Sequence, residues 1–143
     1  MNFLLLFFAF IFSYTLSAQT QTRSSVQVNI QEASSDRGMI RVLLFSGAAG
    51  FPNQVGNAVK SFSLPPKNKQ VAFTITDLVP GTYALAVIHD QDSNGKLSSN
   101  AVGYPIEKFG FSNNPKVYFS PPSFEKASFV LGKTPIKVTI SLR

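Results

Sequence analysis

Hydrophobic and polar residues alternate with a period of two along much of the chain. The clearest example is segment 70–76, where Val71, Phe73 and Ile75 alternate with small or polar residues. Alternation of this kind is typical of β-strands that bury one face. The same pattern predicts further strands at 26–31, 58–64, 83–88 and 136–142.

Segment 39–45 differs because it is hydrophobic on both faces apart from Arg41, which predicts a strand near the middle of a packed sheet. Turns rich in Gly, Pro and Asn separate the strands; at Pro80-Gly81, for example, the residue types suit a type II turn. No long stretch has the 3.6-residue period of a helix. About seven short strands predict an all-β fold, an antiparallel β-sandwich of immunoglobulin-like or transthyretin-like topology.

The first residues have the pattern of a secretion signal. Residues 3–12 are an unbroken apolar run, and Leu16-Ser17-Ala18 ends in the small residue that a signal peptidase favours. The run is shorter than a membrane-spanning helix requires. We therefore expect a signal peptide at 1–18, export to the periplasm or beyond, no transmembrane anchor after cleavage, and a single β-sandwich domain at 19–143.

The amino-acid composition limits which classes of binding partner are expected for this protein. The chain has 13 Lys and Arg against seven Asp and Glu, a net charge of +6, and no cysteine. The absence of cysteine excludes disulfide bonds and lipoprotein acylation. The basic residues never form a run and no ladder of aromatic residues accompanies them, so nothing indicates nucleic-acid binding. We expect these lysines to be solvated on strand faces and edges; the alternative is weak, long-range attraction to an acidic glycan or another anionic component of the cell envelope.

An oxygen-rich loop, residues 89–97 (His-Asp-Gln-Asp-Ser-Asn-Gly-Lys-Leu), follows the strand predicted at 83–88. Its spacing matches the first half of a calcium-binding loop. In that register the ligand positions one, three, five and seven are Asp90, Asp92, Asn94 and the carbonyl of Lys96, and the turn glycine is Gly95.

The second half of the loop departs from the calcium pattern. Ser98 stands at position nine and Ala101 at position twelve, where a bidentate glutamate is usual. We expect Glu107, or Asp77 from an earlier turn, to supply the missing carboxylate after folding. With so few acidic ligands, affinity for Ca²⁺ is expected to be weak, about 10⁻⁴ to 10⁻³ M.

A loop without metal is the alternative. Asn94-Gly95 is a favoured pair for a tight hairpin turn, and Asp90 and Asp92 can hydrogen-bond nearby backbone N–H groups without any ion. Both interpretations require a glycine at Gly95, so only ion dependence separates them.

His89 is the sole histidine, and alternation places it on the same face as Tyr83, Leu85 and Val87. We expect it to pack in the core or to support the loop; metal ligation and acid–base catalysis are the alternatives. No serine or cysteine motif accompanies it, so a nucleophilic triad has no support.

Two further hypotheses remain, and the first concerns segment 101–122. Its rings Tyr104, Phe109, Phe111 and Tyr118 are candidates for a platform that stacks on sugars, unless the loop buries them. Asp90, Asp92 and Glu107 are alternatively the paired carboxylates of a glycoside hydrolase, provided that they lie within about 10 Å of one another.

Several motifs together resemble one family. They are the turn 77–83 (Asp-Leu-Val-Pro-Gly-Thr-Tyr), His89-Asp90, 94–97 (Asn-Gly-Lys-Leu), 103–107 (Gly-Tyr-Pro-Ile-Glu), 109–114 (Phe-Gly-Phe-Ser-Asn-Asn) and 121–124 (Pro-Pro-Ser-Phe). In this order the chain resembles the DUF2141 family of exported bacterial proteins. The resemblance implies a fold class and export but no activity, and the family pattern implies an acid near Ser98. The combined hypothesis is an exported, non-catalytic β-sandwich that acts as a binding or structural module of the bacterial envelope.

Overall fold

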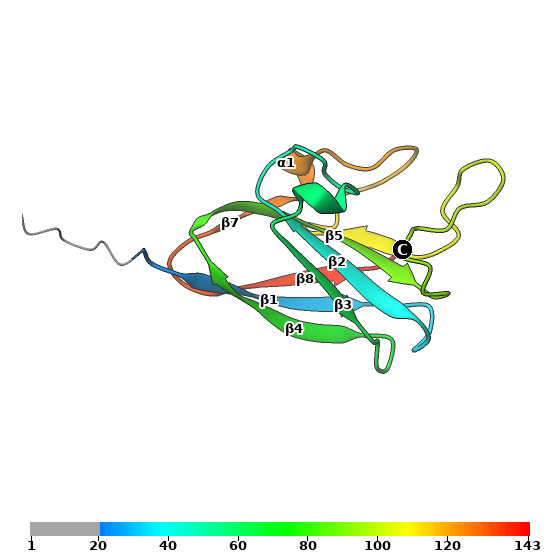
Figure 1. The fold of residues 1–143 in the computed structure, drawn as a ribbon, viewed down its shortest axis with the longest axis horizontal. Coiled ribbons are helices and arrows are strands. Elements are labelled where there is room, and N and C mark those ends of the chain that lie inside the picture. The colour runs from blue at the N-terminus through cyan, green and yellow to red at the C-terminus, as the bar shows by residue number, and fades with distance from the viewer. Residues whose placement is uncertain (1–20) are drawn as a thin grey trace, which may run out of the picture.

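The computed structural model describes residues 21–143, and the signal peptide predicted at 1–18 lies outside the described residues (Figure 1). The described part is nearly all β-strand, as predicted. Its elements are β1 (Ser24–Gln31), β2 (Met39–Phe45), the short 3₁₀ helix η1 (Val55–Asn57), β3 (Lys60–Leu64), β4 (Val71–Leu78), β5 (Gly81–Asp90), β6 (Phe109–Phe111), α1 (Phe124–Ala127), β7 (Ser128–Leu131) and β8 (Ile136–Ser141). No helix within residues 21–143 is long and apolar enough to cross a membrane.

The strands form two sheets. One has the order β4-β1-β8, and the other has the order β3-β2-β5-β6, with β7 pairing β5 as well. Strand pairs are antiparallel except β1 and β8, which run parallel from Val26↔Ile136 to Gln31↔Ser141. The structure confirms the predicted β-sandwich, and this one parallel pair is an exception to its otherwise antiparallel pairing. The parallel direction arises because the chain crosses from one sheet to the other between β7 and β8.

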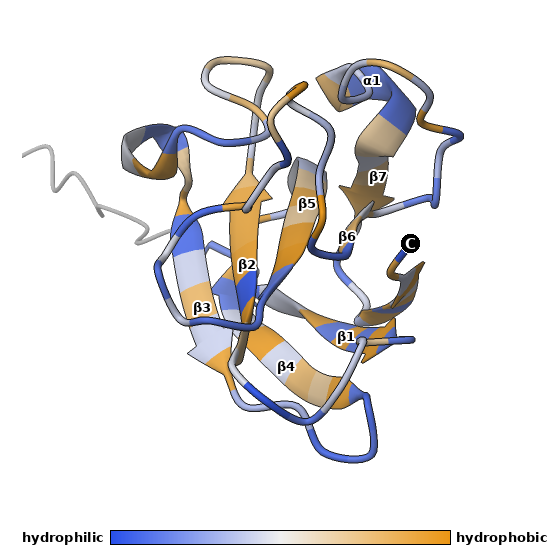
Figure 2. Ribbon diagram, turned by 90° about the vertical axis from the view of Figure 1, so that its right-hand side faces the viewer, coloured by the Kyte–Doolittle hydropathy of each residue, from blue (hydrophilic) through white to orange (hydrophobic). Residues whose placement is uncertain are grey.

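The main core lies between the sheets and is built by alternate residues, as the period-two pattern predicts. Val26, Val28 and Ile30 of β1 are buried, and they meet Leu85 and Val87 of β5 within one cluster. Figure 2 shows hydrophobic residues along β2 and β5, whereas most connecting loops are hydrophilic.

A second, smaller core covers the other face of β5. Ala84, Ala86 and Phe111 pack there with Phe45 and Ala127, and the rings of Phe51 and Phe124 close the cluster. The centroids of the Phe51 and Phe124 rings are 5.9 Å apart in an edge-to-face arrangement, which favours aromatic pairing. Strand β5 is thus buried on both sides.

Ser112 fills a gap in the sheet beside β5. Strand β7 pairs β5 from Gly81 to Ala84 and β6 pairs it from Ala86 to Ile88, so Leu85 has no strand partner on that edge. The Oγ of Ser112 accepts a hydrogen bond from the Leu85 N–H (2.8 Å), and the Ser112 N–H donates to the Leu85 carbonyl (3.1 Å). Its hydroxyl also donates to the carbonyl of Ala127. One buried serine therefore joins β5, β6 and α1.

Candidate metal site at the end of β5

Asp90 is the last residue of β5 and the most buried acidic group of the candidate site. Its side chain exposes no surface, and it forms an ion pair with Arg41 of β2, whose own side chain is 33% exposed. The N–H groups of Asn94 and Gly95 donate to its two carboxylate oxygens, each at 2.9 Å. Burial raises the pKa of Asp90, but these hydrogen bonds and the Arg41 charge outweigh burial and hold the pKa below its usual value.

Glu107 joins the two ends of the loop. It is buried just before β6, and its oxygens accept hydrogen bonds from the N–H groups of Gln91 and Ser98, both at 2.8 Å. Asp77, the other acid considered for this position, lies elsewhere and pairs with Arg23 at 3.6 Å. The structure therefore brings Glu107 to the loop.

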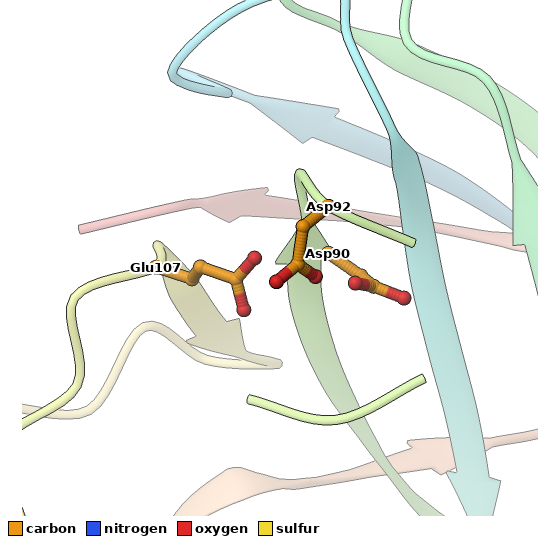
Figure 3. Close-up of side chains that lie close together, drawn as sticks. All are labelled: Asp90, Asp92 and Glu107. Atoms are coloured by element: carbon orange, nitrogen blue, oxygen red, sulfur yellow. The ribbon is translucent and has the colours of Figure 1, made fainter. Parts of the chain in front are cut away.

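The three carboxylates of Asp90, Asp92 and Glu107 converge at one place. One oxygen from each lies within 4.8 Å of the others. In Figure 3 the carboxylate of Asp92 stands between those of Glu107 and Asp90. Two oxygens bound to one Ca²⁺ at 2.3–2.6 Å are separated by at most about 5 Å, so this cluster fits a single ion.

The remaining loop residues surround this cluster with hydrogen bonds. The amide of Asn94 donates to Asp92 (2.8 Å) and to the hydroxyl of Ser98 (3.0 Å), and its oxygen accepts from the Lys96 N–H (2.8 Å). These contacts place Asn94 and Ser98 beside the carboxylates.

The loop is not the tight Asn-Gly hairpin that the sequence left open. A type I′ turn needs positive φ at both central residues. Here Ser93 (φ 58°) and Gly95 (φ 83°) have positive φ, and Asn94 does not. Gly95 is required for its backbone conformation alone, since a Cβ there meets open space.

His89 is fully buried, as expected for a core or support residue. Its Nδ1 accepts a hydrogen bond from the Ser34 N–H (3.1 Å), and its Nε2 lies 2.8 Å from the Arg37 carbonyl, to which it donates. Both nitrogens are engaged with the β1–β2 connection. The ring therefore fixes the β1–β2 connection rather than the candidate loop, and it offers no free nitrogen to a metal.

The four aromatic residues of the proposed sugar platform are not brought together. Phe109 and Phe111 pack with each other and with the second core, whereas Tyr104 and Tyr118 are exposed. Sequence reasoning treated them alike because residue type alone does not reveal which ring the loop buries.

Two shallow pockets lie away from the carboxylates. One, of about 330 Å³, opens beside Leu78 and Tyr83. The other, of about 220 Å³, is lined by the segment from Lys116 to Ser123 and by Lys126.

One family model, described as an uncharacterised protein conserved in bacteria (DUF2141), matches residues 28–139. The chain belongs to the DUF2141 family. No curated protein and no solved structure matches it. The DUF2141 match includes Asp90, Asp92 and Glu107 together with Ser112, so the cluster and the serine that organises β5 both lie within the family domain.

Proposed function

We propose that this DUF2141 protein is an exported, non-catalytic β-sandwich module of the bacterial envelope whose loop from Asp90 to Ser98 holds one weakly bound Ca²⁺. The observation that carries the calcium proposal is the convergence of Asp90, Asp92 and Glu107 within 4.8 Å. The signal-like pattern at 1–18 supports export.

Oxygen donors suit a hard cation such as Ca²⁺. Asn94 and Ser98 lie beside the three carboxylates, and the spacing of the loop makes Asn94, Ser98 and the carbonyl of Lys96 the candidate neutral ligands. Affinity is expected in the range of about 10⁻⁴ to 10⁻³ M, which is typical of extracellular modules. Arg41 lowers it further, because its guanidinium already pairs with Asp90 and would compete with the ion.

A bound ion would make the loop from Asp90 to Ser98 more ordered. Asp92 is exposed and is attached to the loop only through Asn94. A cation would link Asp92 to Glu107 and offset the negative charges that Arg41 leaves unpaired. The loop leading to Tyr104 would then be fixed relative to β5 and β6.

The carboxylates are poorly suited to glycoside hydrolysis, although they lie close together. All six of their oxygens accept hydrogen bonds. A general acid needs a raised pKa, whereas the hydrogen bonds and charge around Asp90 lower its pKa. The two pockets described above are lined by other residues. These features favour a binding or structural role.

The test is a calorimetric titration of chelator-treated protein with Ca²⁺, repeated with Mg²⁺. We expect saturable heat with Ca²⁺ and, at ten times Kd, a stabilisation of about 1.4 kcal/mol, or about 4 °C in Tm. Asp92→Asn should abolish the calcium-dependent rise in Tm without unfolding the protein, because Asp92 is exposed.

Asp77→Asn is the matched control, since it removes the same charge from another exposed acid outside the cluster. It should leave the calcium response unchanged. Absence of heat and of any Tm shift in the unaltered protein would reduce the loop to a structural turn and refute the calcium proposal.

A further inference from the structure

Exposed hydrophobic side chains gather in two loops. Of the eight large hydrophobic residues exposed in the described part of the chain, five lie in the loops that flank β6: Val102, Tyr104, Ile106, Tyr118 and Phe119. Phe119 is fully exposed and Tyr118 is 71% exposed. In Figure 1 both loops project toward the right-hand side of the view.

The loop from Asn113 to Ser123 is anchored to the fold on both sides of these two rings. At its start, the amide of Asn114 donates to the Thr139 carbonyl (3.0 Å) and accepts from the Ser141 N–H (2.9 Å). Val117 packs against the second core, and Pro122 is buried. Tyr118 and Phe119 lie between these two anchored points and are left facing solvent.

Most of the net positive charge lies in the part of the sequence that includes this loop. Residues 108–143 hold six of the 13 basic residues but only one of the seven acids, Glu125, which gives them a net charge of +5. Residues 1–107 hold seven basic and six acidic residues. Lys116 and Lys126 line the shallow pocket that Tyr118 and Phe119 also border.

We propose that the Lys116–Lys126 segment docks on an anionic phospholipid surface, with Tyr118 and Phe119 inserted at the level of the headgroups and Lys116 and Lys126 against the lipid phosphates. Aromatic side chains flanked by lysines are the residue types that bind membrane interfaces. Anionic lipid attracts each nearby lysine. The proposal rests on the envelope assignment above but not on the calcium site.

A membrane fits this surface better than a protein or a glycan does. Two rings at one loop tip are too small for a stable protein interface, which buries at least about 1,000 Å². Phe119 has no polar group with which to bind sugar hydroxyls. Insertion into lipid requires neither a large complementary surface nor a hydrogen bond from the ring.

The test is vesicle flotation with residues 19–143, which contain both core clusters and lack the apolar run at 3–12. The buffer contains EDTA, so failure of the calcium proposal cannot affect the result. We expect binding to vesicles containing phosphatidylglycerol, weakening as salt rises, and none to pure phosphatidylcholine. The double variant Tyr118→Ser, Phe119→Ser should bind at least about tenfold more weakly.

Two matched controls localise the effect. Val130→Ser removes an equally exposed hydrophobic side chain from β7 and should bind normally. Lys116→Gln with Lys126→Gln should weaken binding about fivefold per lysine, whereas Lys67→Gln with Lys69→Gln, in the β3–β4 turn, should have much less effect at the same net charge. The proposal is overturned if the unaltered protein binds no anionic vesicles, if the Tyr118/Phe119 variant binds normally, or if both lysine pairs weaken binding equally. Binding of a soluble glycan through Tyr118 without any vesicle binding would also overturn it.

Discussion

At the scale of single residues, the pairing of Arg41 with Asp90 explains how a fully buried carboxylate stays charged. Each oxygen of Asp90 has at least one donor, so its burial leaves no unsatisfied charge. The sequence marked Asp90 as a candidate ligand and Arg41 as an oddity within an apolar strand. Their contact was not predictable because it depends on the register that places Met39 opposite Asp90.

This pair predicts a pH-dependent stability. Because the pKa of Asp90 is lowered in the folded state, its contribution to the free energy of unfolding is present at neutral pH. That contribution is lost as the pH falls below the usual range of an aspartate. Arg41→Met should therefore lower the free energy of unfolding by about 2 kcal/mol at pH 7. Breaking a fully buried ion pair would cost more, but Arg41 is partly exposed. In urea unfolding the difference from the unaltered protein should shrink toward pH 3. An equal difference at both pH values would contradict this account, and Arg37→Met, at an exposed arginine, serves as the control.

Ser112 carries a second prediction at this scale. Ser112→Ala removes the partners of the Leu85 N–H and the Ala127 carbonyl, two buried groups. We expect a loss of about 2–4 kcal/mol in the free energy of unfolding, since each unsatisfied buried group costs about 1–3 kcal/mol. Ser120→Ala, at an exposed serine of the same segment, should change stability by less than about 0.5 kcal/mol. Similar effects of the two substitutions in urea unfolding would show that Ser112 does not hold the sheet together.

At the scale of elements, strands with a long alternating pattern were predictable and short ones were not. Segments 26–31 and 70–76 match β1 and β4 closely, because six or seven residues suffice to show a period, and segment 39–45 matches β2 because it is an almost unbroken apolar run. Strands β6 and β7 and helix α1 have only three or four residues each, too few for a period to be recognised. Tertiary contacts fix them instead, chiefly Ser112 and the second core.

The residues of the candidate site also differ in how far the sequence could predict them. Asp90, Asp92, Asn94 and Gly95 were identified from local spacing, and the loop indeed wraps Asp90. The choice of Glu107 over Asp77 required the fold, since neither acid is local to the loop.

The close approach of the β1–β2 connection to the end of β5 leads to a prediction about Gly38. Gly38 has φ +72°, and a Cβ there would lie 2.2 Å from the carbonyl oxygen of Asp90. Gly95 also has positive φ but faces open space. Gly38→Ala should therefore cost at least about 3 kcal/mol, through a clash added to strain, whereas Gly95→Ala should cost about 1–2 kcal/mol through strain alone. Thermal or urea unfolding of the two variants compares them directly, and equal costs would show that the clash at Gly38 is relieved by backbone movement.

At the scale of the whole molecule, the two core clusters have different structural roles. The cluster between the sheets holds the sandwich together, while the cluster outside β5 positions the loops that flank β6. The candidate metal site and the exposed rings of Tyr118 and Phe119 both belong to those loops. Both proposed binding regions thus lie beside β5, the strand that is buried on both faces.

The central place of β1 in the three-stranded sheet constrains the order in which the chain can fold. Strand β1 is the first of the strands in the described residues, yet one of its edges is completed only by β8, the last of them. Until residues 136–141 are available, that edge keeps its backbone groups unpaired and open to wrong partners. The sheet therefore cannot close progressively from β1 onward: a chain emerging from a ribosome or a membrane pore completes it only after residues 136–141 have come through.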